Sequence, residues 1–408
     1  MRPRRVAITG MGLMSPIGDD LDQVVDALRE GRSGVRAIPS WSGWPNLHTR
    51  VAATVNNLDE KAVPRESRRS MGRVALLAAA AAERALVHAR LSREVLQSGR
   101  AGISIGQTVG SPAATELFFE TLRTQGVRGL KSTTFFQLMS HSAAANLALM
   151  FKVTGRVWAP AAACASSSQA IGQAYETIRD GYQEVMLCGG AEELHVTTAA
   201  TFDIVGGTSR AFNDTPAATP RPFDRRRDGL VVGEGAGVLI LEDLSFAVRR
   251  GAQILGEVLG FSTQCDGEHM SVPARAGMAR TMAACLESAG MRVEDVDYIN
   301  AHATGTPVGD AVEAQATADI FGERVPVSST KGFTGHTLAA CGAIEAIFGV
   351  LMMRRGFLAP TLNLDDVDPA CRGIRHVLET QESPVRRVLS NNFAFGGVNT
   401  SLMIGQPQ

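Results

Sequence analysis

Short apolar segments alternate with longer helical stretches along most of the chain. Five segments are apolar and bounded by glycine or charge, and they predict buried strands over 6–9, 101–105, 184–188, 238–241 and 298–300. Four longer stretches are rich in alanine and other good helix formers, and they predict helices over 68–90, 167–179, 274–289 and 344–355. This alternation predicts a layered α/β fold with mixed or parallel sheets.

A faint internal repeat divides the chain into two halves. An apolar strand at 157–158 runs into a small-residue helix start at 161–170, and the same plan returns about 170 residues later at 325–330 and 335–342. Strand-to-helix joints look alike in many α/β proteins, so the repeat alone leaves duplication open. If the halves, 1–250 and 251–408, are related, the two helix starts should face each other across a pseudo-twofold axis.

Charge and hydropathy exclude several classes of protein. The 40 basic and 41 acidic residues give a net charge of −1, which provides no overall attraction to nucleic acid or membrane. The basic start, Met1 to Arg5, runs directly into a strand-like segment without the apolar core of a secretory signal. The apolar run from Val74 to Ala82 is far shorter than the roughly 20 residues that span a membrane. We therefore expect a soluble, cytoplasmic protein.

One of the six cysteines lies in chemically suggestive surroundings. No pair forms a C-x-x-C motif, and the spacing suits neither a zinc site nor a disulfide framework, so we expect no metal. Cys164 stands among alanines and serines at a predicted helix start, where free N–H groups and the helix dipole lower a thiol's pKa. This predicts thiolate near neutral pH, although a buried structural thiol is the simpler interpretation of Cys164 taken alone.

Two histidines and a glycine-rich turn strengthen the catalytic interpretation. His302 and His336 each follow a predicted strand and are surrounded by glycine and threonine rather than by an apolar helix face. A cysteine with distant histidines is typical of a nucleophile that accepts an acyl group. The turn within 391–399 offers backbone N–H groups to a developing oxyanion.

These motifs, in this order, resemble the β-ketoacyl-acyl-carrier-protein synthases, the elongating ketosynthases of the thiolase superfamily. The match runs from Ile8-Thr-Gly-Met-Gly12 to Phe395-Gly-Gly-Val-Asn399, and several stretches, such as Arg221-Pro-Phe-Asp224, resemble synthase I. The resemblance implies a thiolase-like five-layered αβαβα fold of two related halves. It also implies an acyltransferase that performs a decarboxylative Claisen condensation.

The resemblance assigns roles to individual residues. Cys164 would carry the acyl chain, while His302 and His336 would stabilise the enolate formed from the malonyl group, with Lys331 orienting His336. Backbone N–H groups of Cys164 and Phe395 would form the oxyanion hole. Further positions implied are Thr304 and Thr306 for the pantetheine arm, Glu313 and Asp310 as buried acidic partners near Lys331, and Thr108, Val109, Phe202 and Phe393 for the acyl pocket. The alternative roles are turn capping for the two threonines, a structural salt bridge for the two acids, and core packing for Phe202 and Phe393.

The same resemblance predicts the partners. Substrates would be malonyl and acyl groups on the phosphopantetheine of an acyl carrier protein, with no free cofactor. A homodimer, or a heterodimer with a homologous ketosynthase-like subunit, is implied. Arg65, Arg68 and Arg69 precede a predicted helix and are candidates for docking an acidic carrier protein.

Some positions depart from the family pattern. Where relatives commonly have serine, glycine and threonine, this chain has Asn392, Ala394 and Val398. We expect Ala394 to stiffen the turn beside Cys164, because alanine avoids dihedral angles that glycine reaches. Thr108 and Val109 add side chains to a glycine-rich segment of the acyl pocket, which leaves the accepted chain length open.

Three rival interpretations fit less well. Gly10-Met-Gly12 hints at dinucleotide binding, but Ser15 and Pro16 replace the third glycine and the helix start. A papain-like protease would carry its cysteine near the mature N-terminus. A non-catalytic partner subunit of a heterodimer is the remaining alternative, and the intact set of cysteine, histidines and lysine argues against it.

Overall fold

The computed structural model describes residues 3–407. In it, eleven strands form one continuous hydrogen-bonded sheet. The first half contributes, from its edge inward, β5 (Val157–Trp158), β4 (Ala101–Gly106), β6 (Val185–Glu192), β7 (Gly235–Asp243) and β1 (Val6–Met14). The second half contributes, from its edge inward, β12 (Arg375–His376), β10 (Pro326–Ser328), β9 (Tyr298–Asn300), β14 (Arg387–Ala394), β15 (Val398–Gly405) and β8 (Gly256–Cys265). β1 and β8 join the halves through an antiparallel pairing that includes Val6 and Val258.

The two halves have the same strand topology. In the first, β1–β7 and β7–β6 are antiparallel, and β6–β4 and β4–β5 are parallel. In the second, β8–β15 and β15–β14 are antiparallel, and β14–β9 and β9–β10 are parallel. The strands of the first set all precede residue 250 and those of the second all follow it. The prediction of two related halves is confirmed by this repeated pattern.

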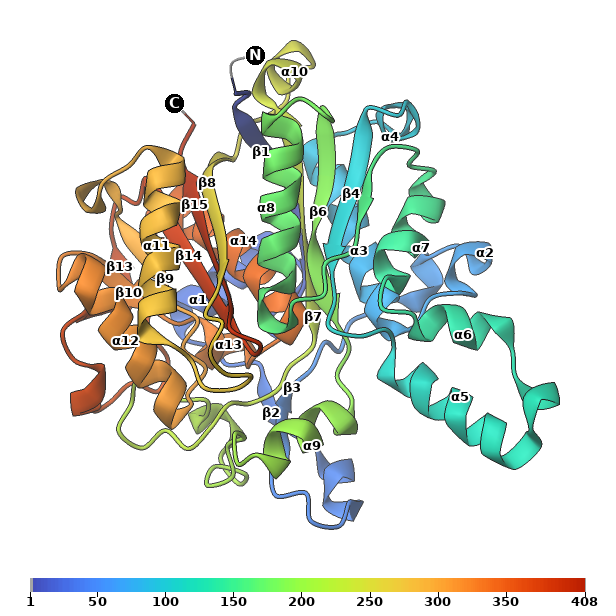
Figure 1. Ribbon diagram of the computed structural model, residues 1–408, viewed down its shortest axis with the longest axis horizontal. Helices are drawn as coiled ribbons and strands as arrows, with labels where there is room; N and C mark the ends of the chain where they lie inside the picture. Colours follow the sequence, from blue (N-terminus) through green and yellow to red (C-terminus); the bar gives the residue numbers. More distant parts are fainter. Residues whose placement is uncertain (1–2, 408) are drawn as a thin grey trace.

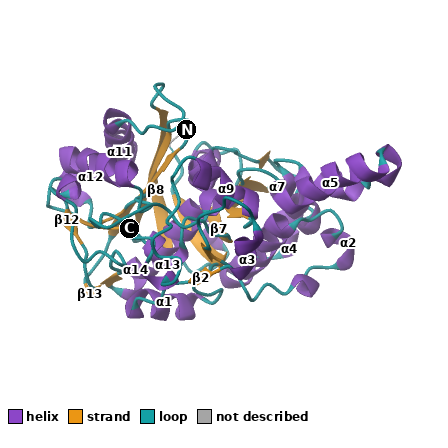
Figure 2. Cartoon of the chain, turned by 90° about the horizontal axis from the view of Figure 1, so that it is seen from below, coloured by secondary structure: helices purple, strands orange, loops and turns teal. Residues whose placement is uncertain are grey.

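Helices form three layers around these strands. α8 (Ser166–Arg179) and α14 (Cys341–Arg355) contact each other and strands of both halves, so they form the central layer (Figure 1). α3 (Arg73–Ala89) covers β1 and β7 on one outer face. On the other outer face, α11 (Arg275–Ala289) covers β8 and β15 and packs on α12 (Pro307–Phe321), and Figure 2 shows these two helices on the side away from α3. The layers follow the predicted αβαβα order.

Packing between layers explains two features of the sequence. Almost every residue of α14 is buried, as expected for a helix that is apolar on all sides. Gly10 and Gly12 lie where β1 meets α3, and a Cβ atom on Gly12 would stand 2.2 Å from the carbonyl oxygen of Ala81. These glycines therefore allow close packing of helix and strand, in agreement with the rejection of a dinucleotide site.

The remaining elements are shorter or peripheral. The other strands pair in two ribbons, β2 (Val35–Ala37) with β3 (Val51–Ala53) and β11 (Phe357–Leu358) with β13 (Gln381–Glu382). The other α-helices are α1 (Leu21–Glu30), α2 (Arg65–Arg68), α4 (Arg93–Gln97), α5 (Pro112–Gln125), α6 (Ser132–Leu138), α7 (Ser142–Phe151), α9 (Val196–Ile204), α10 (Leu244–Arg249) and α13 (Lys331–Thr334). The 3-10 helices are η1 (Pro39–Gly43), η2 (Glu60–Ala62), η3 (Val127–Gly129), η4 (Ala163–Ala165), η5 (Pro216–Ala218), η6 (Val293–Asp295), η7 (Leu338–Ala340) and η8 (Pro369–Cys371).

The predicted elements all exist, and their ends differ in places. The helix predicted over 68–90 is α3, which begins only after Gly72, because the chain turns at 69–72 after the short separate helix α2 ends at Arg68. The strands predicted over 6–9 and 184–188 extend to Met14 and Glu192. Met1 and Arg2 of the basic start lie outside the described residues. Within residues 3–407, no helix combines the length and apolar character needed to cross a membrane.

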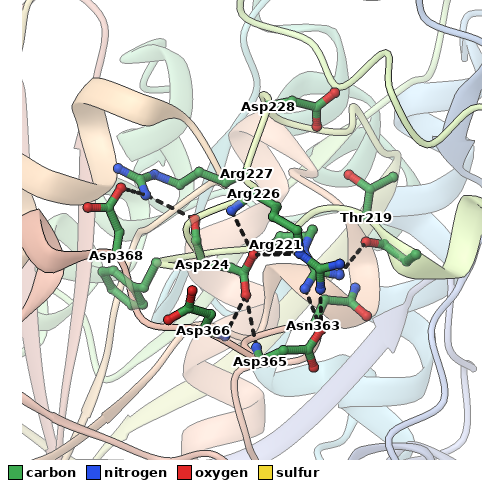
Figure 3. A network of polar contacts seen from close by, with 12 residues as sticks. Thr219, Arg221, Asp224, Arg226, Arg227, Asp228, Asn363, Asp365, Asp366 and Asp368 are labelled. Carbon is green, nitrogen blue, oxygen red and sulfur yellow. Dashed lines mark hydrogen bonds and ion pairs between the residues drawn. The ribbon is translucent and has the colours of Figure 1, made fainter.

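Segment 213–228, irregular in sequence, is ordered by a network of ion pairs (Figure 3). Buried Arg221 pairs with Asp224 and with Asp365, while buried Arg227 pairs with Asp368 at 2.6 Å. Asp224 also accepts backbone hydrogen bonds from Asp365 and Asp366. The network therefore attaches this segment to the chain near residues 363–368.

Candidate active site

Cys164 lies on η4 at the start of the central helix α8. The turn is held by Ser166, whose hydroxyl donates to the carbonyl of Ala163 at 2.7 Å and accepts from the N–H of Ala162 at 2.8 Å. Ala163 has a left-handed φ of 46°, and Leu338 at the equivalent start of η7 has the same value. The two halves therefore present matching turns, one carrying Cys164 and the other following His336.

The two turns face each other, as the internal repeat predicted. His336 Nε2 lies 2.9 Å from Cys164 Sγ. His336 is fixed by its backbone, whose N–H donates to Val231 at 2.7 Å and whose carbonyl accepts from Gly233 at 2.9 Å. The His302 ring stands edge-on to the His336 ring with 5.1 Å between centroids. Cysteine and both histidines are thus brought together from distant parts of the chain.

The resting thiol is not acidic, so the prediction of thiolate near neutral pH is wrong. Burial raises the pKa of Cys164 to about 12, although Lys331 and the backbone N–H groups of Cys164 and Phe395 act in the opposite direction. A helix N-terminus supplies about 1 kcal/mol of electrostatic stabilisation in typical cases, which cannot offset full desolvation of a thiolate. The Cys164 proton must therefore leave as the thiol attacks, and His336 Nε2 is the group within reach.

Both histidines are neutral. Burial, followed by the positive charge of Lys331, lowers the pKa of His302 and of His336 well below 6.5. A neutral imidazole has one N–H, so each ring can donate one hydrogen bond to an oxygen that gains negative charge. The pair therefore suits stabilisation of an enolate.

Lys331 is fully buried, and its ammonium donates to Glu345 rather than to His336. Burial opposes the charge on Lys331, but the Glu345 carboxylate outweighs it and raises the pKa of Lys331 above its usual value. Lys331 therefore acts on the histidines through its charge. Sequence reasoning missed Glu345, whose signal was a single acidic residue within the apolar helix stretch 344–355.

Glu313 and Asp310 are buried, as expected, and Glu313 interacts with Lys331 through its charge, but the hydrogen bonds of both acids go to backbone N–H groups. Glu313 accepts the N–H of His302 at 2.7 Å, and Asp310 accepts those of Thr304 and Thr306 at 3.0 and 3.2 Å. Burial raises the pKa of Glu313 to about 8 and of Asp310 to about 6. Both acids thus hold the loop that carries His302 and the two threonines.

Cys164 lies at the junction of two cavities. The first has a volume of about 420 Å³ and includes His302, His336, Thr304, Thr306 and Phe393 in its lining. The second, about 500 Å³, includes Thr108, Val109 and Leu338. Cys164, Phe202 and Phe395 line both, with the two phenyl rings 5.6 Å apart.

The residues predicted for the acyl pocket are divided between the two cavities. Thr108, Val109 and Phe202 share the second cavity, and the Thr108 hydroxyl donates to the buried Glu192 carboxylate at 2.8 Å. Phe393, predicted for the same pocket, lies instead in the first cavity, 6.4 Å from the His302 ring. Its position at the end of β14 places it on the histidine side.

The glycine-rich turn joins β14 to β15. Its left-handed residues are Gly396 and Gly397, with φ values of 85° and 70°. Ala394 is the last residue of β14, and its φ is not left-handed. In this conformation it therefore does not need a glycine's conformational freedom, and the effect of Ala394 on the stiffness of the turn stays a prediction.

The side chains of Cys164, His302 and His336 also have the spacing of a metal site. Ligand atoms of Cys164, His302 and His336 all lie within 4.8 Å of one another. The Lys331 charge that lowers both histidine pKa values also opposes a divalent cation. The electrostatics therefore favour an anionic intermediate over a metal ion.

Together with the fold of two related halves, this geometry defines a condensing acyltransferase with a cysteine nucleophile and two histidines.

Comparison with known proteins places the chain in a family. It matches the family models "Beta-ketoacyl synthase, N-terminal domain" over residues 3–247 and "Beta-ketoacyl synthase, C-terminal domain" over 255–365. It is 37% identical to 3-oxoacyl-[acyl-carrier-protein] synthase 1 of Haemophilus influenzae, with 98% of each chain covered. The chain belongs to the β-ketoacyl synthase family.

Solved structures agree with this assignment. A β-ketoacyl synthase from Burkholderia phymatum superposes with a TM-score of 0.96 at 45% identity, covering 99% of this chain and all of that one. The ishigamide ketosynthase/chain length factor superposes with a TM-score of 0.92 at 31% identity over the full length of both chains. The thiolase-like fold is thus shared along the whole chain.

Proposed function

We propose that this protein elongates a fatty-acid or polyketide chain by condensing an acyl group on Cys164 with malonyl-acyl-carrier-protein. The observation that carries the proposal is the 2.9 Å approach of Cys164 Sγ to His336 Nε2, with the His302 ring alongside. The nucleophile also lies where two cavities meet. One cavity suits the pantetheine arm, with Thr304 and Thr306 as its polar contacts, and the other suits the acyl chain.

Acyl transfer comes first. The Cys164 thiol attacks the thioester carbonyl while its proton passes to His336 Nε2, and the carbonyl oxygen becomes an oxyanion. Backbone N–H groups of Cys164 and Phe395, which act to lower the pKa of the Cys164 thiol, donate to that oxygen. The bond to the carrier sulfur then breaks, and this sulfur takes the proton from His336. The products are acyl-Cys164 and a free carrier thiol.

Condensation follows on the loaded enzyme. The carbon–carbon bond to the malonyl carboxylate breaks, CO2 leaves, and the electron pair moves onto the thioester as an enolate. His302 donates a hydrogen bond to the enolate oxygen, and His336 does the same once its ring proton has exchanged from Nδ1 to Nε2. The enolate carbon then attacks the acyl carbonyl, the bond to Cys164 Sγ breaks, and the thiolate takes up from water the one proton that the overall condensation consumes. The chemistry uses the carrier's phosphopantetheine and no other cofactor.

We also propose a dimer, formed through the arm of α5 and α6 that projects from the body in Figures 1 and 2. The arm exposes large apolar side chains that a partner would cover, namely Leu117, Phe119, Val127, Phe135 and Phe136. A second chain of this fold, a copy or a ketosynthase-like homologue, is the proposed partner. Phe119→Glu should lower the molar mass measured by light scattering, and an unchanged mass would reject this interface.

An acidic carrier protein and a cytoplasmic location complete the proposal. Arg65 and Arg69 are exposed and Arg68 is partly exposed, at and just after α2, where they suit an acidic surface. Reversing all three charges should weaken carrier binding at low salt, and unchanged affinity would remove them from the interface. All six cysteines are free thiols, which suits a reducing compartment.

Intact-mass analysis with a panel of acyl-carrier-proteins tests the activity. The wild-type protein should gain the mass of one acyl group, and Cys164→Ala should gain none. Cys285→Ala is the matched control, because Cys285 is also a buried thiol but lies on α11 outside both cavities. Acylation of Cys164→Ala, or no acylation of the wild type by any carrier, would refute the proposal.

A further inference from the structure

Asn392, a departure from the family pattern, is a fully buried amide whose orientation is fixed by its neighbours. Its Oδ1 accepts a hydrogen bond from the Ser168 hydroxyl, and its Nδ2 donates to Glu345 Oε2 at 2.7 Å. Only the NH2 end of the amide can donate to a carboxylate. Its backbone is held as well, because Thr400 donates to the Asn392 carbonyl at 3.1 Å.

The same nitrogen faces His302. Asn392 Nδ2 lies 3.4 Å from His302 Nδ1, with Cys341 Sγ as a further neighbour at 3.5 Å. An amide NH2 has two hydrogens and no accepting lone pair. One hydrogen serves Glu345, and the second has His302 Nδ1 and Cys341 Sγ within reach; a hydrogen bond to His302 requires its Nδ1 to act as the acceptor. A neutral ring that accepts at Nδ1 carries its proton on Nε2.

We propose that Asn392 is a positioning residue that selects the Nε2–H tautomer of His302, which makes this histidine a hydrogen-bond donor in the first cavity. The inference rests on the proposed function for its catalytic consequence, because an Nδ1–H tautomer would present a lone pair to the enolate oxygen. Asn392 also connects His302 to the Lys331–Glu345 pair. The serine that relatives commonly carry has a single O–H and cannot donate to Glu345 and His302 at once.

Asn392→Asp tests the tautomer directly. The aspartate side chain, protonated or ionised, has an oxygen lone pair that can accept a hydrogen bond from His302. The ring proton of His302 should therefore move to Nδ1. Long-range ¹⁵N–¹H correlation spectra of histidine-labelled, purified protein distinguish the two tautomers, and His302→Gln assigns the signal. Release of CO2 from malonyl-acyl-carrier-protein should fall by about 10²-fold, the usual cost of losing one oxyanion donor. Acylation of Cys164, which does not use His302 in the proposed mechanism, should fall less than CO2 release.

Asn391→Asp is the matched control. Asn391 is the neighbouring buried amide on β14, and its partners are Ser401 and Met282 rather than His302. This variant should keep the wild-type tautomer and rate. If Asn392→Asp melts before the spectrum is recorded, Asn392→Leu removes both hydrogens without adding charge and should leave a mixture of tautomers.

The outcomes separate this inference from the proposed function. An Nε2–H tautomer that persists in Asn392→Asp, or that is the sole tautomer in Asn392→Leu, would overturn the inference. Wild-type CO2 release in Asn392→Asp, with the tautomer changed, would overturn its catalytic consequence. If the wild-type protein shows the Nε2–H tautomer yet releases no CO2 from any malonyl carrier, the positioning role stands and the proposed function fails.

Discussion

Glu345→Gln tests the buried ion pair that sets the charge of the active site. The Lys331 side chain is 0% exposed and that of Glu345 is 3% exposed, so neither charge has water as an alternative partner. Removing one member of such a pair leaves the other desolvated and unpaired, which costs about 3–5 kcal/mol. The entropy of unfolding is about 2.1 cal/mol/K per residue, and the chain has 408 residues. Dividing the lost free energy by the total entropy gives a Tm lower by about 4–6 °C.

Differential scanning calorimetry measures this change against two reference variants. Asp319→Asn breaks the exposed pair between Arg275 and Asp319 and should leave the Tm unchanged. The double variant Lys331→Met with Glu345→Leu replaces the pair by apolar side chains and should recover most of the lost stability. A Tm of Glu345→Gln equal to that of Asp319→Asn would refute the reasoning, as would a double variant less stable than the single one.

Three further predictions concern the reaction. His336→Ala should acylate Cys164 slowly, because the thiol loses its proton acceptor, and should release CO2 from malonyl-acyl-carrier-protein about 10²–10³-fold more slowly than the wild type; a wild-type rate in either half-reaction would contradict the role given to His336. Thr108→Gly should lengthen the acyl chains accepted, because Thr108 lines the second cavity; an identical product profile by mass spectrometry would remove it from the acyl site. The pKa values of both histidines lie well below 6.5, so protonation of the histidines should not change kcat above pH 6.5. The histidines should become protonated, with loss of activity, only at lower pH. An activity loss centred at pH 6.5 in the pH–rate profile would contradict neutral histidines.

The sequence predicted most of what local pattern determines. The five strands and four helix-forming stretches exist, and the repeat at 157–170 and 325–342 corresponds to matching turns at Ala163 and Leu338. The motifs also indicated which side chains meet, since Cys164 and His336 end 2.9 Å apart although they are distant along the chain. Strand-to-helix joints can be recognised locally because small residues and glycines are required where backbones approach closely.

What the sequence did not predict depends on burial and on long-range contacts. The pKa of Cys164 was assigned the wrong direction, because the helix dipole is visible in sequence whereas complete desolvation is not. Glu313 was expected near Lys331 and interacts with it through charge, but the ion pair of Lys331 is with Glu345, one helix turn after Cys341 on α14, which was not predicted. The contact from Asn392 to His302 joins a residue on β14 to one in the loop after β9, and no local pattern indicates it.

The most direct test of the account uses malonyl-acyl-carrier-protein labelled with ¹³C at the free carboxylate, added to enzyme already acylated on Cys164. The account predicts one ¹³CO2 for each product, and a β-ketoacyl product that is two unlabelled carbons longer than the loaded acyl group. Label retained in the product, or release of ¹³CO2 with the acyl group left unextended on Cys164, would contradict it.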